Sequence, residues 1–222
     1  MDPSEYGTYL VTQQSISGDR STIDVVRAAI EGGVDVVQLR EKDTDARWRY
    51  ELGLELRELT AEAGVDLIVN DRVDVAEAID ADGVHVGQSD LPVAVARELL
   101  GPEAIVGCST ATAEEALEAE AAGADYLGVG TVYGTTSKDV DRYKNGVGPE
   151  RIAEIVDAVS IPVVGIGGVT ADNAAPVVEA GATGVAVISE ITAADDPRAA
   201  TAALADAVET AKGVGDASVA DE

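Results

Sequence analysis

The stretch IPVVGIGGVTADNAAPVVEAGATGVAVIS (residues 161–189) contains two apolar runs with a helix-like segment between them. Residues 161–166 and 183–189 are short and rich in valine and isoleucine, which is typical of strands. The segment ADNAAPVVEAG between them ends in glycine, a common residue at a helix stop. Because a strand, a helix and a second strand of these lengths join as parallel neighbours, the stretch predicts a βαβ unit.

The same alternation recurs along the chain. Further strand-like runs, each followed by an amphipathic helix-like segment, lie at residues 8–12, 34–40, 65–70, 83–86, 104–108 and 124–130. Eight such units in roughly 210 residues fit a closed barrel, so we predict an α/β protein, a single-domain (β/α)8 TIM barrel over residues 1–212. We expect a last helix at about 197–211 and an acidic, disordered tail at 213–222. The alternative is an open doubly wound sheet, but no G-x-G-x-x-G motif follows the first strand.

Composition excludes several classes of function. The net charge of −27 repels nucleic acid and anionic membranes, and the absence of phenylalanine leaves little aromatic surface for stacking on bases. The single cysteine, Cys108, excludes an internal disulfide and a multi-cysteine metal site. We expect a cytoplasmic protein, because no signal peptide pattern or long apolar span is present. The acidic excess indicates a halophilic source, because salt near 1 M screens charges beyond roughly 3 Å. The oligomeric state stays open, a homo-oligomer included.

Polar residues follow the predicted strands at their carboxyl ends, where the active site of such a barrel lies. In strand order these residues are Gln38, Arg40 and Lys42; Asn70 and Asp71; Gln88 and Asp90; Ser109 and Thr110; Thr135, Thr136, Ser137 and Lys138; Gly167 and Gly168; and Ser189. The lone histidine, His85, lies within a strand between two valines, and we expect it to be a packed interior residue.

Asp71 and Asp90 follow two neighbouring predicted strands. Two carboxylates there suit Mg²⁺, which takes one or two protein carboxylates and completes its shell with water and substrate phosphates. The alternative is helix capping, since both residues precede helical segments. The nearby bases Arg40, Lys42 and Lys138 favour a Mg²⁺-diphosphate site.

A second anion site is predicted near the segments GIGGV (165–169) and VISEI (187–191). Glycine lets backbone N–H groups approach a phosphate closely, and barrels often bind phosphate after strands 7 and 8. The alternative is a tight turn that needs small residues. The hydroxyls and ammonium of TTSK (135–138) also suit phosphate oxygens. Two anion sites in one pocket suggest a transferase that joins a diphosphate ester to a phosphate-bearing partner.

Over residues 8–210 the chain resembles the thiamine-phosphate synthase family. The resembling segments, in order, are YLVT (9–12), QLREK (38–42), VNDRVDVA (69–76), ADGVHVGQSD (81–90), GCST (107–110), ADYLGVGTVYGTTSK (124–138) and residues 163–189. The resemblance implies a Mg²⁺-dependent transferase of thiamine biosynthesis that acts on small molecules. It would condense 4-amino-2-methyl-5-(diphosphooxymethyl)pyrimidine with hydroxyethylthiazole phosphate to give thiamine phosphate and pyrophosphate.

The resemblance also implies roles for individual residues. The residues that would hold the pyrimidine diphosphate are Gln38, Leu39, Arg40, Glu41, Lys42, Asn70, Ser109 and Lys138, with Arg40, Lys42 and Lys138 as the catalytic cations. Asp71 and Asp90 would ligate Mg²⁺. The residues that would hold the thiazole phosphate are Thr135, Thr136, Ser137, Gly168, Ile188 and Ser189.

Two alternatives remain at this stage. A thiazole phosphate tautomerase shares the fold but needs no diphosphate and metal set, and this sequence retains Gln38, Arg40, Lys42, Asp71 and Asp90. A non-catalytic phosphate-binding barrel would bind the same anions without turnover.

Overall fold

The computed structural model describes residues 1–134 and 146–219, and within them eight parallel strands close into one barrel in the order β1 to β8. The strands are β1 Thr8–Val11, β2 Val36–Leu39, β3 Asp66–Asn70, β4 Gly83–Val86, β5 Ile105–Thr110, β6 Tyr126–Gly130, β7 Val163–Ile166 and β8 Gly184–Val187. Strand β1 pairs with both β2 and β8, which closes the ring and rules out the open doubly wound sheet.

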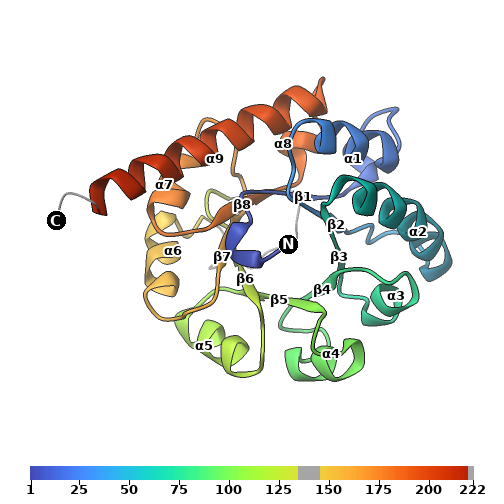
Figure 1. Ribbon diagram of the computed structural model, residues 1–222, viewed down its shortest axis with the longest axis horizontal. Helices are drawn as coiled ribbons and strands as arrows, with labels where there is room; N and C mark the ends of the chain where they lie inside the picture. The colour runs from blue at the N-terminus through green and yellow to red at the C-terminus, as the bar shows by residue number, and fades with distance from the viewer. Residues whose placement is uncertain (135–145, 220–222) are drawn as a thin grey trace.

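Helices surround this ring (Figure 1). They are α1 Thr22–Glu31, α2 Ala46–Ala63, α3 Val73–Ala78, α4 Val93–Leu100, α5 Ala113–Ala121, α6 Pro149–Val156, α7 Ala175–Glu179, α8 Ser189–Thr192 and α9 Pro197–Val219. Two short 3₁₀ helices, η1 Pro3–Glu5 and η2 Gln14–Ile16, flank β1, and η1 lies over the centre of the barrel in Figure 1. The predicted (β/α)8 barrel is therefore confirmed; most strands are slightly shorter than their apolar runs, whereas β4 has the predicted bounds and β5 is one residue longer.

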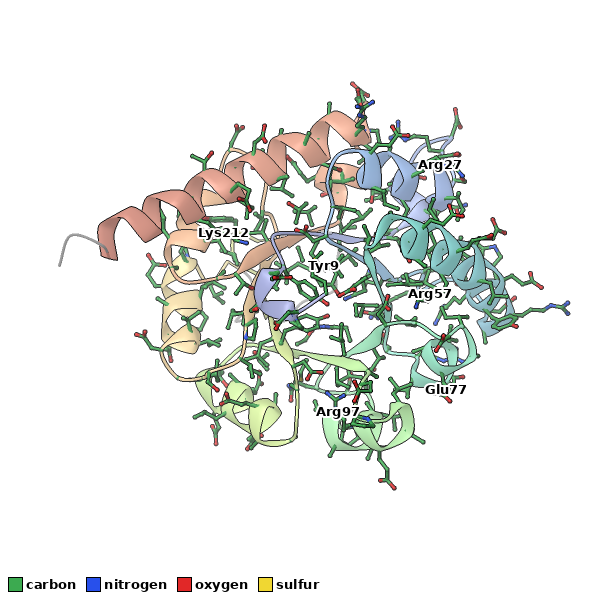
Figure 2. All side chains as sticks on the ribbon, in the orientation of Figure 1. Tyr9, Arg27, Arg57, Glu77, Arg97 and Lys212 are labelled. Carbon is green, nitrogen blue, oxygen red and sulfur yellow. The ribbon has the colours of Figure 1, made fainter. Side chains whose placement is uncertain are left out.

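The hydrophobic core has two layers, as the period-2 alternation of strand side chains requires. Tyr9 and Val11 belong to a cluster inside the barrel, whereas Leu10 between them belongs to the larger layer under the helices. Figure 2 shows Tyr9 inside the ring and Arg27 and Glu77 on its outer rim. Cys108 lies in the outer layer, and burial raises the pKa of its thiol to about 11, so the expectation of a small buried residue is confirmed.

The last helix is longer than the sequence pattern indicates. We expected it to end near residue 211, but α9 continues to Val219 and packs along α1, α7 and α8 (Figure 1). The helix therefore runs past residue 213, where we expect the tail to begin, because glycine weakens a helix by only about 1 kcal/mol and does not by itself stop it. Residues 220–222 lie outside the described part of the chain. No helix that the structure describes is long and apolar enough to cross a membrane.

Candidate active site

The carboxyl end of β2 supplies the first group of site residues. Gln38 is 4% exposed and points into the barrel, where its side-chain amide bonds to Tyr9. Arg40 follows the strand and lines a pocket of about 440 Å³ with Lys42 and Trp48. Burial lowers the pKa of Arg40, and the carboxylates of Asp71, Glu41 and Asp43 act in the opposite direction. This pocket therefore holds a buried guanidinium and an exposed ammonium, together with the acidic residues Glu41 and Asp43.

Leu39 and Glu41 belong to the same segment, but their side chains point elsewhere. Leu39 is 2% exposed and packs in the layer between strands and helices. The Glu41 carboxylate accepts hydrogen bonds from the backbone N–H of Gln14, at 3.0 and 3.1 Å, and from the hydroxyl of Thr22 at 3.2 Å. These side chains stabilise the barrel and the connection after β1, so only their backbone is free to serve a ligand.

Asp71 and Asp90 come together at the ends of β3 and β4, beside Lys42. Lys42 Nζ lies 3.5 Å from Asp71 Oδ2. Burial raises the pKa of the Asp71 carboxyl, a hydrogen bond with Asp90 raises it further, and Lys42 partly offsets both effects. Asp71 has a φ of 63°, an uncommon conformation for a residue with a side chain and one that clusters at functional sites.

The helix-capping alternative does not account for these two carboxylates. The residue that caps α3 is Arg72, and the residue that caps α4 is Pro92; neither helix has a side-chain cap. Asp90 does accept a hydrogen bond from the N–H of Gly87 at 2.7 Å through Oδ2, which fixes its orientation in the turn after β4. Among the described residues no cluster of three or more metal-ligating side chains occurs, so this site offers a cation two carboxylates.

A second pocket, of about 80 Å³, lies after β7 and β8. It is lined by Gly168, Ile188 and Ser189, three of the residues expected to hold the thiazole phosphate. Gly167 and Gly168 have φ values of 103° and 68°, which side chains rarely adopt, so the turn does need glycine. Such a conformation also leaves backbone N–H groups exposed to an anion.

A third, smaller pocket opens between the first two, inside the barrel. Gln38, His85 and Ser109 line it together with Tyr9 and Tyr126, and it shares the side chains of Ile166 and Ala186 with the pocket after β7 and β8. His85 is 7% exposed, as expected of an interior residue, but its ring also reaches the site through Ser109, with 2.8 Å between Nε2 and Oγ.

Several other residues complete the comparison with the sequence. Asn70 ends β3, half-buried, and pairs in register with His85. Thr135, Thr136, Ser137 and Lys138 lie outside the described residues.

Sequence reasoning missed Tyr9, Tyr126, Trp48 and the segment 13–15, which line these pockets. Alternation along β1 and β6 could have indicated the two tyrosines, because both positions face the barrel interior.

A parallel barrel whose strand ends carry a buried guanidinium, an exposed ammonium, paired carboxylates and a glycine-built pocket belongs to the TIM-barrel class of enzymes. A family model described as thiamine monophosphate synthase matches residues 8–191. The chain belongs to this thiamine monophosphate synthase family.

Individual relatives agree with this assignment. The chain is 65% identical over 205 residues to a thiamine-phosphate synthase of Natronomonas pharaonis, covering 92% of this chain and 96% of that protein. It is 61% identical to the thiamine-phosphate synthase of Haloarcula marismortui, covering 92% and 98%. The solved structure of a thiamine phosphate pyrophosphorylase from Pyrococcus furiosus superposes with a TM-score of 0.85 at 42% identity, covering 94% of this chain and 98% of that one. The presence of halophilic relatives agrees with the acidic composition.

Proposed function

We propose that this chain condenses 4-amino-2-methyl-5-(diphosphooxymethyl)pyrimidine with hydroxyethylthiazole phosphate. The bond between the methylene carbon and the diphosphate oxygen breaks, the bond between that carbon and the thiazole nitrogen forms, and pyrophosphate leaves. The family assignment and the names of the relatives support this reaction.

One observation carries the proposal: two sites suited to anions share the same end of one barrel. The first combines Arg40 and Lys42 with the carboxylates of Asp71 and Asp90. The second is the glycine pocket at Gly168 and Ser189. Strands β3 and β7 are four positions apart in the ring of eight, so their ends face each other across the mouth. A diphosphate on one side and a phosphate on the other bring the two rings to the pocket between them.

The diphosphate side suits a leaving group. Arg40 and Lys42 neutralise charge that develops on the departing diphosphate, and we assign Lys138 the same role from the family resemblance. Burial and the nearby Asp90 raise the pKa of the Asp71 carboxyl, and a bound cation would stabilise both carboxylates in their charged form. Asp71 and Asp90 therefore fit Mg²⁺ in number and chemistry. Bound there, Mg²⁺ would supply further charge neutralisation for the phosphate oxygens.

The remaining residues hold the two substrates. Gln38, Asn70 and Ser109 position the pyrimidine, and backbone groups of Leu39 and Glu41 contribute beside them. The residues assigned to the thiazole phosphate are Thr135, Thr136, Ser137, Gly168, Ile188 and Ser189. When the diphosphate departs, the methylene carbon of the pyrimidine takes on carbocation character, and the thiazole nitrogen attacks that carbon directly. No side-chain nucleophile is therefore required.

A thiazole phosphate tautomerase is not favoured. That reaction needs no diphosphate, whereas Arg40, Lys42, Asp71 and Asp90 are all retained and brought together at one mouth. A non-catalytic barrel is also not favoured, since the curated relatives quoted above are named as synthases.

The proposal is tested by mixing both substrates with the purified chain, with and without Mg²⁺, and measuring thiamine phosphate and pyrophosphate. We expect both products in equal amounts and only with the metal present. Isomerisation of the thiazole without pyrophosphate release would favour the tautomerase, and binding of both ligands without either product would favour the non-catalytic barrel.

A further inference from the structure

A chain of four hydrogen bonds crosses the barrel interior from β2 to β5. Gln38 Nε2 donates to Tyr9 Oη at 2.8 Å, and Tyr9 Oη lies 2.8 Å from Tyr126 Oη. Tyr126 Oη lies 3.0 Å from His85 Nδ1, and His85 Nε2 lies 2.8 Å from Ser109 Oγ. We name these five residues the Gln38–Ser109 relay. Both of its ends line the small pocket between the two anion sites.

The interior is shaped around this relay. Tyr9 and Tyr126 are 2% and 1% exposed. A Cβ atom at Gly107 would lie 2.2 Å from the Tyr126 ring, and one at Gly128 would lie 2.9 Å from the His85 ring. The two glycines therefore leave the space that the rings of the relay occupy, and the rings have little freedom to turn away.

The hydrogen bonds can be given a direction. Among the described residues Tyr9 Oη is bonded to Gln38 and Tyr126, and it accepts from Gln38. The Tyr9 O–H must then donate its hydrogen bond to Tyr126 Oη, because a buried donor without an acceptor is costly. Burial raises the pKa of both phenols, so they keep their protons.

The direction continues to the other end. Tyr126 Oη accepts a hydrogen bond from Tyr9, so its own O–H donates to His85 Nδ1, which must then be an acceptor, and the ring carries its hydrogen on Nε2. Nε2 then donates to Ser109 Oγ, so the Ser109 O–H is left to donate a hydrogen bond to a ligand. At the Gln38 end the amide nitrogen is turned to Tyr9, so the amide oxygen is left as an acceptor.

We propose that the Gln38–Ser109 relay fixes one acceptor and one donor in this pocket and thereby selects a 4-aminopyrimidine over a 4-oxopyrimidine. An aminopyrimidine presents an amino donor beside a ring-nitrogen acceptor, which matches Gln38 Oε1 and the Ser109 hydroxyl. A 4-oxopyrimidine presents an oxygen acceptor beside an N–H donor, the reverse pattern, and would leave both pairs unmatched. Tyr9, Tyr126 and His85 are positioning residues in this account, which rests on the proposed function.

The first test compares Tyr126→Phe with Tyr6→Phe. Tyr6 belongs to the same aromatic cluster, but its hydroxyl donates to Asp66 at 2.8 Å and is not part of the relay. The measured quantity is the ratio of kcat/KM for the 4-amino substrate to kcat/KM for its 4-oxo analogue. We expect Tyr126→Phe to lower this ratio by at least about tenfold, because the Gln38 amide can then flip and the His85 proton can move from Nε2 to Nδ1. Tyr6→Phe should leave the ratio unchanged. An equal ratio in both variants would overturn the proposal.

The second test needs no substrate. His85 is the only histidine in the chain, so ¹⁵N-histidine labelling reports one imidazole without assignment. We expect the spectrum of the wild-type chain at neutral pH to show the proton on Nε2, and the spectrum of Tyr126→Phe to show a mixture of tautomers. A wild-type ring with its proton on Nδ1 would refute the relay. A wild-type chain that makes no thiamine phosphate would instead refute the proposed function, and the tautomer would still decide the relay.

Discussion

Replacing Gly168 with alanine tests whether the turn after β7 shapes the thiazole phosphate pocket. A Cβ atom at Gly168 would lie 2.3 Å from the carbonyl oxygen of Gly134 and 3.1 Å from Tyr133 Cβ. Carbon atoms and their neighbours pack comfortably at about 3.5 Å, so the turn and the segment at Gly134 must separate by roughly 1 Å. Gly134 directly precedes Thr135, to which the proposal assigns the same phosphate.

The expected magnitude has two parts. An alanine at a φ of 68° costs roughly 1–2 kcal/mol of folding free energy, because its Cβ crowds the following carbonyl oxygen. A displacement of roughly 1 Å in groups that position a substrate lowers kcat/KM by about 100-fold, which is about 2.7 kcal/mol of transition-state stabilisation. Gly168→Ala should therefore lose activity beyond its loss of stability.

Gly64 provides the matched control. Its φ is 70°, it ends α2 at the opposite end of the barrel, and a Cβ atom there would meet no other atom within 4 Å. Both variants should unfold at similarly reduced urea concentrations, but only Gly168→Ala should lose kcat/KM for the thiazole phosphate when the pyrimidine substrate is saturating. The reasoning is refuted if kcat/KM of Gly168→Ala stays within about threefold of the wild-type value, or if kcat/KM of Gly64→Ala falls as much as that of Gly168→Ala.

Three further predictions concern the metal, salt and pH. Asp71→Asn and Asp90→Asn should each lower Mg²⁺-dependent turnover by about 100-fold while changing the free energy of unfolding, measured in urea, by less than about 1 kcal/mol. A loss of unfolding free energy as large as the loss of transition-state stabilisation would show that these residues are structural. Because the net charge is −27, the thermal midpoint should rise by at least about 5 °C from low to molar KCl, and a midpoint independent of salt would contradict this. Burial raises the folded-state pKa of Tyr6, Tyr9 and Tyr126, so stability should be constant below the unfolded value near pH 10 and fall above it by about 1.4 kcal/mol per pH unit for each phenol. Urea unfolding between pH 8 and 11 measures this slope, which Tyr6→Phe should reduce by one phenol; a flat profile would show that the rings are not buried in solution.

Local patterns were sufficient to predict the barrel. Valine-rich runs such as residues 163–166 and 184–187 have the length of strands, and the glycines between helix and strand mark the turns. Their regular alternation specifies parallel neighbours, and the carboxyl ends of the strands then locate the mouth. For this reason Asp71 and Asp90 could be paired from sequence although 19 positions separate them.

The relay could not be predicted in the same way. Tyr9 and Tyr126 are 117 positions apart, and their contact depends on the closure of the ring and on the space that Gly107 leaves. The sequence favoured a packed interior for His85 because it lies between two valines, and the ring is indeed buried. Nothing local indicates that the same ring bonds to Ser109, because that contact depends on the pairing of β4 with β5.

Alternation within one segment separates residues that stabilise the barrel from residues that meet a ligand. Gln38 faces the interior pocket, Leu39 faces the helices, and Arg40 lies at the mouth. Glu41 reaches the same mouth, yet both of its oxygens hold the connection after β1. A substitution at Glu41 would therefore lower activity by loosening that connection, whereas one at Arg40 removes a charge from the pocket. Turnover alone cannot distinguish the two causes, but turnover measured beside the free energy of unfolding can, because only the loss at Glu41 appears in both.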